Sequence, residues 1–431
     1  MCWALAWGGT LNTASGGVKR LRRRAEHRAS YILVRAPRPY PGLDLTGGAG
    51  AAHRIPLLDG LRGYAVLLVL VYHFAAPFRQ SADTAAAFVY RIISFGWTGV
   101  DLFFVLSGFL ITGILFDAKG SAGYFRTFYM RRALRILPLY YGALAAIFFL
   151  PRMVDSPTAE RFATPASDQI WYWLYLQNFH IMPGDVAQFT GHLWSLAIEE
   201  QFYLVWPVVI FALSRRTALL ACGALAVFAL GLRVWLVLVV GNHGVTVFSA
   251  TQTRIGGLVI GAAVALLARG ERGLEIPRRL AFATVAITSA LLAVVFIQSG
   301  YFATASRLQS SFGLSAVAML YGAVLVLSIE RPPRFLAAAL GSRSMAFFGR
   351  YGYGLYVLHV PVLIVLGSSG VTAERLVRLT GNPVVALVAY VAVLLAATTA
   401  CAWLSWHFYE KHFMALKSRF DYGRRVAPVA K

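Results

Sequence analysis

Apolar stretches long enough to cross a membrane recur along this chain from residue 57 to residue 409. Each stretch holds few charged residues, and the segments between them are polar or basic. The pattern leaves no long soluble domain, so it predicts an all-α fold, a polytopic membrane helix bundle that must itself hold the activity. About ten transmembrane helices are expected, at 57–78, 94–116, 136–150, 200–213, 217–240, 251–268, 280–298, 313–329, 351–368 and 383–409.

The net charge of +22 could indicate a nucleic-acid partner, but the distribution of the charge argues against one. If the N-terminus is cytoplasmic and the ten helices alternate in direction, most of the 40 Lys and Arg residues fall in cytoplasmic segments. That bias is the positive-inside rule. We therefore expect both termini in the cytoplasm, a multi-pass protein of the plasma (cell inner) membrane in contact with the lipid bilayer, and no nucleic-acid partner.

Composition divides the chain into three segments. Residues 1–54 are rich in Gly, Ala and Arg and are expected to form a basic, disordered tail. The alternative for this tail is that its polybasic run 19–24 binds anionic lipid. Residues 55–413 are expected to form the membrane domain, and residues 414–431 a basic cytoplasmic tail.

The cysteines and histidines do not predict a metal site. Cys222 and Cys401 lie in apolar stretches and Cys2 lies at the terminus, which suits neither a disulfide framework nor a metal cluster. The sequence also lacks a metal-spaced His/Cys set, a phosphate loop and a G-x-S-x-G motif. We expect no metal.

The first apolar stretch carries a polar set that a plain membrane anchor would not tolerate. Asp59 and Arg62 precede an apolar run that ends at His73. Arg62 and His73 lie eleven residues apart, which on a helix is roughly 16 Å. Ionisable groups are costly in lipid, so these side chains should face the interior of the bundle or a water-filled cavity, where a functional role is expected.

The second apolar stretch reads as a helix-packing segment with one exception. Gly99, Ser107, Gly108 and Gly113 permit close approach of neighbouring helices. Asp101 is the exception, because a carboxylate at the membrane boundary needs a partner or water.

A basic segment precedes the third stretch. Arg131, Arg132 and Arg135 stand on its cytoplasmic side, and Arg132 and Arg135 share one face if the segment is helical. The guanidinium group of arginine can bind two phosphate oxygens at once, so this segment could form the entrance through which a phosphorylated cofactor binds. An ordinary positive-inside flank is the alternative.

A long, aromatic-rich outer loop at 151–199 leads into a second polar segment. If that segment is helical, His192, Ser195 and Glu199 lie on one face. Glu199 and Glu200 enter an apolar stretch together, which is costly unless one is protonated, paired or hydrated, and one of them could orient or accept a proton from His73. Helix capping and an interfacial aromatic belt are the alternative.

Later polar positions are sparser. Arg254 starts the stretch at 251–268 and could contact an anion or pair with a carboxylate. Tyr356 and His359 lie in the stretch at 351–368, where a structural hydrogen-bonding role is the ordinary interpretation of a single histidine.

Taken together, these segments resemble the membrane acyltransferase-3 family, which includes bacterial O-antigen and other surface-sugar O-acetyltransferases. The resemblance runs from about residue 55 to residue 413, nearly the whole chain outside the tails. The matching stretches, in this order, are LDGLRGYAVLLVLVYHF, GVDLFFVLSGFLITGIL, RRALRILP, HLWSLAIEEQFYLVWP, TRIGGLVIGA, GYGLYVLHVP and SWHFYE.

The resemblance implies an acyl-CoA co-substrate, usually acetyl-CoA, approached from the cytoplasm, and a hydroxyl acceptor that is often a glycan. It implies that His73 is catalytic with Glu200 as its carboxylate partner. Arg62, Arg132 and Arg135 would then serve the CoA phosphates. The sequence departs from the family pattern at Gly256, where an acidic residue is common, near Gly352, where a Ser is common, and at His412, where a Pro is common.

Many members of this family carry a fused periplasmic SGNH-type hydrolase domain. This sequence is expected to be the stand-alone form, so that either it completes the transfer itself or a separate periplasmic transferase does. The expected function is O-acylation of a cell-surface carbohydrate. The alternatives are O-acylation of a small molecule such as a macrolide or of a lipid-linked sugar, and, in another class, a secondary transporter or exporter of a glycan intermediate.

Overall fold

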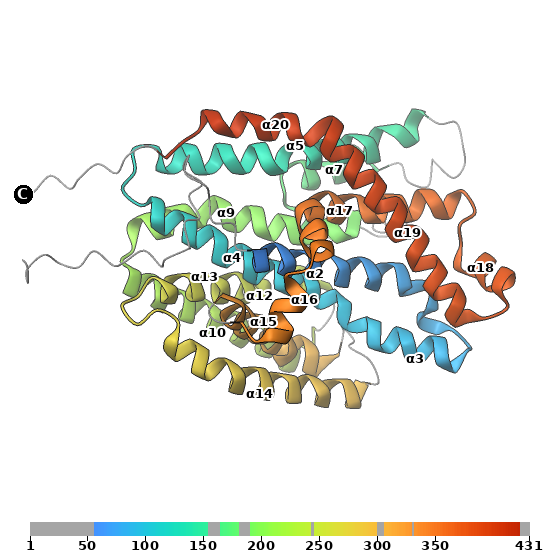
Figure 1. Cartoon of the computed structure of the whole chain (residues 1–431), viewed down its shortest axis with the longest axis horizontal. Helices are drawn as coiled ribbons and strands as arrows, with labels where there is room; N and C mark the ends of the chain where they lie inside the picture. Colours follow the sequence, from blue (N-terminus) through green and yellow to red (C-terminus); the bar gives the residue numbers. More distant parts are fainter. Residues whose placement is uncertain are drawn as a thin grey trace, which may run out of the picture.

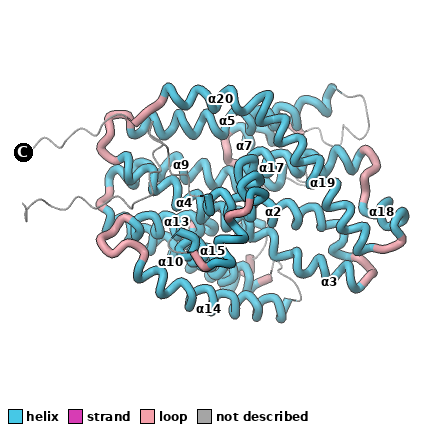
Figure 2. Tube along the Cα trace, viewed as in Figure 1, coloured by secondary structure: helices cyan, strands magenta, loops and turns pink. Residues whose placement is uncertain are grey.

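The computed structural model describes residues 56–153, 164–180, 190–242, 245–299, 306–329 and 332–422. Within these ranges the chain is almost entirely helical and contains no β-strand, as the tube in Figure 2 shows. The predicted all-α bundle is thereby confirmed. The predicted tail at 1–54 and the last part of the predicted C-terminal tail, 423–431, lie outside the described residues.

The long helices lie side by side roughly along the long axis of the molecule (Figure 1), with α14 at one border, α5 and α20 at the other, and α2 and α4 between them. The α-helices are α2 (Pro56–Ala75), α3 (Thr84–Ile93), α4 (Gly99–Ala118), α5 (Tyr124–Met153), α7 (Ala166–Trp173), α9 (Trp194–Ala212), α10 (Arg215–Leu238), α11 (Val245–Ser249), α12 (Thr251–Arg254), α13 (Gly256–Ala268), α14 (Glu275–Ser299), α15 (Leu314–Ile329), α16 (Arg334–Leu340), α17 (Arg343–Ser368), α18 (Ala373–Thr380), α19 (Pro383–Ser405) and α20 (Lys411–Ala415).

Nine helical segments in the described part of the chain are long and apolar enough to cross a membrane. The remaining predicted span, 251–268, is divided between the single turn α12 and the helix α13 (Gly256–Ala268), which is too short to be counted among the nine. The 13 residues of α13 extend about 20 Å, less than the ~30 Å hydrocarbon core. α13 is buried along most of its length, so it is an internal helix of the bundle.

Several predicted helix starts were too late in the sequence, among them those of α5, α9 and α17. α5 begins at Tyr124, so the arginines expected in a loop at 117–135 lie on a helix, and α9 begins at Trp194, ahead of the predicted 200–213. A span predicted from hydropathy ends at the first charged residue, because charged side chains oppose insertion into lipid. Here the helices continue through the charges because those side chains line a polar cavity inside the bundle.

Close contacts between backbones hold the centre of the bundle. α4 packs on α13 and α2 packs on α17 along much of their length. Gly108 of α4 lies against the backbone of Leu258, and Gly261 of α13 lies against the backbone of Val105. Small residues at such crossings let helix backbones approach and gain dispersion contacts where lipid removes the usual hydrophobic drive.

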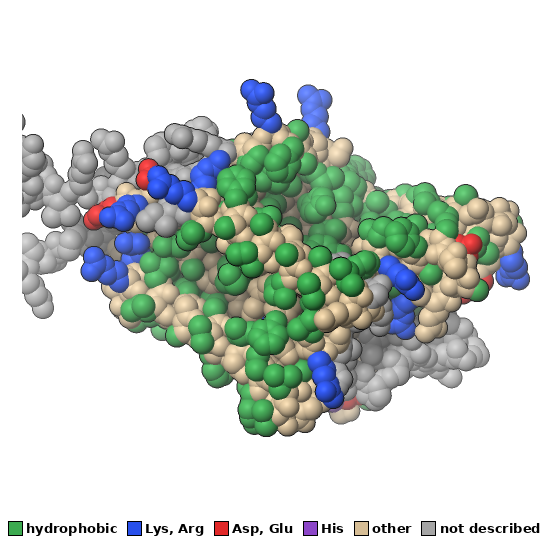
Figure 3. All heavy atoms as spheres, turned by 90° about the horizontal axis from the view of Figure 1, so that it is seen from below, with side chains coloured by type: hydrophobic (Ala, Val, Ile, Leu, Met, Phe, Trp, Pro, Cys, Tyr) green, Lys and Arg blue, Asp and Glu red, His purple; other side chains and the backbone are tan. Residues whose placement is uncertain are grey.

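The outer surface of the bundle is apolar. Hydrophobic side chains are spread over the visible face in Figure 3, while Lys and Arg side chains lie at several places around it, with one group at one end. Leu220 of α10 and Ile297 of α14, for example, are 74% and 78% exposed. Large exposed aliphatic side chains on long apolar helices are the lipid-facing surface of a multi-pass membrane protein.

Replacing Gly108 by Val should destabilise the bundle, because the new side chain meets the backbone of Leu258. Overpacking of this kind costs about 1–3 kcal/mol. The measurement is thermal unfolding of the detergent-purified protein. Gly223→Val on α10 is the matched control, because a Cβ there meets nothing within 4 Å. Equal loss of stability in the two variants would mean that helix propensity, and not the α4–α13 contact, sets the effect.

Candidate active site

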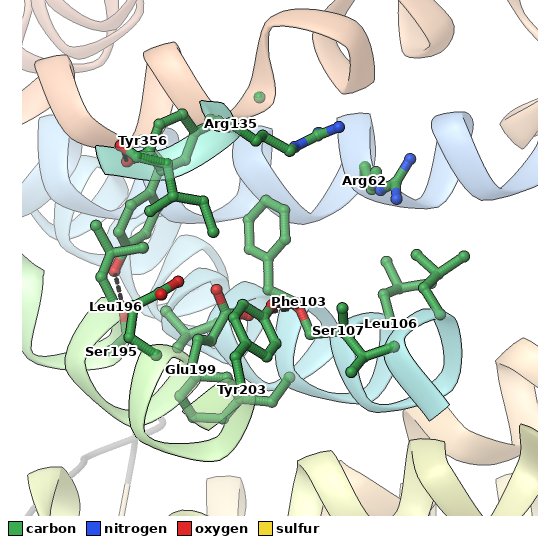
Figure 4. A pocket seen from close by; sticks show the side chains of 18 of the residues that line it. Arg62, Phe103, Leu106, Ser107, Arg135, Ser195, Leu196, Glu199, Tyr203 and Tyr356 are labelled. Carbon is green, nitrogen blue, oxygen red and sulfur yellow. Dashed lines mark hydrogen bonds between the residues drawn. The ribbon is translucent and has the colours of Figure 1, made fainter. Parts of the chain in front are cut away.

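Helices α2, α4, α5, α9 and α17 enclose a cavity of about 110 Å³. One part of its wall is apolar and includes Phe103, Leu110 and Ile111. The rest is polar, with side chains that come from all five helices (Figure 4). The polar lining residues are Arg62, Ser107, Arg132, Arg135, Ser195, Glu199, Glu200, Tyr203, Tyr353 and Tyr356.

Three arginines form the cationic side of this cavity. Arg62 on α2 donates from Nη1 to Asp59 Oδ1 at 2.9 Å, so the carboxylate one turn earlier fixes the position of the guanidinium. Arg132 on α5 lies over the ring of Tyr203, with 5.7 Å from Cζ to the ring centroid. Arg135, one helical turn further, points toward the same side as Arg62 (Figure 4). The three predicted phosphate-binding arginines are therefore brought together.

The acidic side of the cavity is organised around Glu199. Ser107 Oγ on α4 donates to Glu199 Oε1 at 2.5 Å, and Tyr203 OH donates to Ser107 Oγ at 3.0 Å. This chain of hydrogen bonds links α9 to α4. Glu200 also lines the cavity. Within the described residues it makes no hydrogen bond to His73, so its predicted pairing with that histidine is not seen in this conformation.

Ser107 and Tyr203 were missed as site residues by the sequence interpretation. Ser107 stands in a glycine-rich helix, where a small residue is read as a packing position. The signal for Tyr203 was present, because it lies four residues after Glu199 and so on the same helix face.

Ser195 and Tyr356 close the cavity at its other end. Their hydroxyl oxygens lie 2.6 Å apart, and Tyr356 OH donates to the carbonyl of His192 at 2.8 Å. His192 itself lies in the 3₁₀ turn Gly191–Leu193 ahead of α9, and its Nε2 donates to the carbonyl of Val357 at 3.2 Å. His192 and Ser195 both contact Tyr356 of α17, while Glu199 lines the cavity.

Three histidines from distant parts of the sequence meet beyond Tyr356. His73 Nδ1 lies 3.3 Å from His359 Nε2, and the rings of His192 and His359 are 4.8 Å apart between centroids. None of the three is among the residues that line the cavity. Tyr356, which lines the cavity, contacts the rings of both His192 and His359. The structure therefore joins the arginines and glutamates in one cavity and leaves His73 outside its lining, linked to Tyr356 through His359.

Asp101 and Arg254 form a buried ion pair outside the cavity. Arg254 Nη2 donates to Asp101 Oδ2 at 3.0 Å, and the two side chains are 1% and 4% exposed. The guanidinium also lies within 4.8 Å of the Phe248 ring centroid and 5.3 Å of the Trp194 ring centroid. Of the two alternatives for Arg254, the structure shows the carboxylate partner. The pair is a brace between α4 and α12.

Arg233 on α10 is a second buried cation. It is 2% exposed and donates to the carbonyl of Thr253 and to Ser315 Oγ. Its partners are neutral, and they join α10 to α12 and α15. No group of three or more His, Cys, Asp or Glu side chains within the described ranges could hold a metal ion.

The chain is similar in sequence to known acyltransferases. A family model described as an acyltransferase domain matches residues 55–407. The Bacillus subtilis protein YrhL is 30% identical over 87% of this chain and 57% of its own length. The peptidoglycan O-acetyltransferase OatA of Listeria monocytogenes is 28% identical over 72% of this chain and 49% of its own length.

The O-acetyltransferase OatA of Staphylococcus aureus is 26% identical over 73% of this chain and 51% of its own length. The chain thus spans about half the length of these relatives. No solved structure gives a significant match to the chain.

Removing one partner of the buried ion pair should destabilise the protein more than removing both partners. Arg254→Met leaves the Asp101 carboxylate buried without its partner, which costs about 3–5 kcal/mol. The double variant Asp101→Leu/Arg254→Met should recover most of this loss in a thermal unfolding measurement, because no buried charge is then left unpaired. If the double variant loses as much stability as the two single variants lose together, the ion pair does not join α4 to α12.

Proposed function

This chain belongs to the membrane acyltransferase-3 family, and from that premise we propose that it is an O-acyltransferase of the plasma membrane. It moves an acyl group, most simply acetyl, from acyl-CoA to a hydroxyl of a cell-surface carbohydrate. The acceptor class is suggested by the name of one relative, the peptidoglycan O-acetyltransferase of Listeria monocytogenes. Peptidoglycan, O-antigen and exopolysaccharide are the glycans to test.

The observation that carries the proposal is the cationic side of the cavity. Arg132 and Arg135 line it, and within the described residues neither has a carboxylate at ion-pair distance. Guanidinium groups inside an apolar bundle are costly unless a ligand compensates their charge. The phosphate and diphosphate groups of CoA supply that charge, and the planar forks of arginine match their oxygen atoms.

The apolar wall suits the other end of the same molecule. Phe103, Leu110 and Ile111 offer contacts to a pantetheine arm and an acyl group. The thioester would then point toward Tyr356, which contacts the ring of His359 beside His73.

His73 supplies the chemistry of the transfer. Its Nδ1 lies 2.9 Å from the carbonyl of Val69 and so donates a proton to it, which leaves the lone pair on Nε2. As a base, Nε2 takes the proton of the acceptor hydroxyl while the hydroxyl oxygen forms a bond to the thioester carbonyl carbon. The carbon–sulfur bond breaks, and the leaving thiolate takes the proton from Nε2. If His73 instead carries the acyl group briefly, the same lone pair makes the bond.

Acetyl transfer tests the proposal directly. Detergent-purified protein is incubated with radiolabelled acetyl-CoA, with and without a cell-envelope glycan fraction, and free CoA and labelled glycan are measured. We expect label on the glycan and a loss of about 10²- to 10⁴-fold in His73→Ala, the contribution of a positioned base. No release of CoA with any acceptor, while the protein remains folded, would contradict the enzyme and favour an exporter of a glycan intermediate.

The arginines should act on binding of the donor. Arg132→Gln and Arg135→Gln should each raise KM for acetyl-CoA roughly 10- to 100-fold, the value of a hydrogen bond to a charged group, and leave kcat nearly unchanged. The matched control is Arg126→Gln, an exposed arginine near the start of the same helix α5. An equal effect of the control variant would show that overall positive charge, and not this cavity, attracts CoA.

A further inference from the structure

The protonation of His359 follows from its neighbours. His359 on α17 is fully buried, and its Nδ1 lies 2.6 Å from the carbonyl oxygen of Tyr356. A carbonyl oxygen only accepts hydrogen bonds, so Nδ1 of the neutral ring carries the hydrogen and Nε2 carries the lone pair. His359 therefore presents a hydrogen-bond acceptor to whatever lies at Nε2.

What lies there is His73. The distance from His359 Nε2 to His73 Nδ1 is 3.3 Å, and the two ring centroids are 4.9 Å apart. The same His73 Nδ1 donates to the carbonyl of Val69. One N–H group of His73 is thus shared between two acceptors, one on its own helix and one on α17. Both acceptors favour the same tautomer, which has its lone pair on Nε2.

The scaffold fixes this pair of rings. α2 and α17 pack along much of their length, with Gly63 of α2 against the backbone of Met345 and Gly349 of α17 against the backbone of Asp59. Because the two backbones cannot separate without losing these contacts, His73 and His359 are held at a set distance. The ring of His192 packs edge-on against His359 and closes the other side.

We propose that His359 is a positioning residue of the acyl-transfer site, whose Nε2 accepts the Nδ1–H of His73 and so aims the Nε2 lone pair of His73 at the reacting groups. This inference rests on the proposed function. During the transfer the proton of the acceptor hydroxyl moves to His73 Nε2 and then to the leaving thiolate. His359 neither gains nor loses a proton. It stabilises the transient His73 cation, because the shared hydrogen bond becomes charge-assisted.

The two ring nitrogens of His359 have different roles, and two substitutions separate these roles. In His359→Gln the side-chain amide reaches the former position of Nε2 and its oxygen can accept from His73. In His359→Asn the shorter side chain retains a donor near Nδ1 for the Tyr356 carbonyl but cannot reach His73. His412→Asn on α20 is the matched control, because His412 is exposed and lies outside the site.

The experiment measures kcat and KM for acetyl-CoA, together with the thermal unfolding midpoint, for the full chain in detergent. We expect His359→Asn to lower kcat about 10- to 100-fold at unchanged KM, the range for a hydrogen bond to a charged group. His359→Gln should keep kcat within a few-fold of the wild type. Both variants should bind acetyl-CoA as tightly as the wild type does.

Two results would overturn the inference while leaving the proposed function intact. One is an active wild type with kcat unchanged in His359→Asn. The other is an equal loss of kcat in His359→Asn and His359→Gln, which is the result expected of a merely structural histidine at the Tyr356 carbonyl. Absence of acetyl transfer by the wild type, in contrast, would mean that the proposed function itself has failed.

Discussion

The close packing of α2 against α17 is the constraint on which the rest of the site depends. Glycines at this crossing, Gly63 and Gly349 among them, let the two backbones touch. α2 carries Arg62, and His73 lies about three turns further along the same helix. α17 carries Gly349 and Tyr356 beside the cavity and His359 beyond it. A wider separation of these helices would remove the contact between the two histidines and enlarge the cavity that Arg62 lines.

Buried charged side chains have different partners in the scaffold and in the site. Away from the cavity, charges are neutralised or fully hydrogen-bonded: Asp101 pairs with Arg254, and Arg233 donates to neutral oxygens. Inside the cavity, Arg132 and Arg135 have no carboxylate at ion-pair distance within the described residues, although Glu199 and Glu200 line the same space. Charge that a scaffold would compensate is here left available, which is the property expected of an anion-binding site in a membrane protein.

Much of this could be read from the sequence, and the failures have physical causes. The length and hydropathy of the apolar stretches predicted the bundle, and the family resemblance grouped Arg62, Arg132 and Arg135, which line one cavity in the structure. Helix starts were placed too late because charge was read as a helix end. The contact of His73 with His359, 286 residues apart in the sequence, could not be read from local spacing. Neither could the roles of Ser107 and Tyr203, which depend on how α4 meets α9.

Binding of the donor is the most direct test of the central claim, that the arginine-lined cavity is an acyl-CoA site. Radiolabelled acetyl-CoA is titrated onto the detergent-purified protein, and unlabelled CoA and pantetheine are compared as competitors. The account predicts saturable binding that CoA displaces and that pantetheine, which lacks the phosphates, displaces only weakly. No saturable binding to the folded protein, or equal displacement by the two competitors, would contradict it.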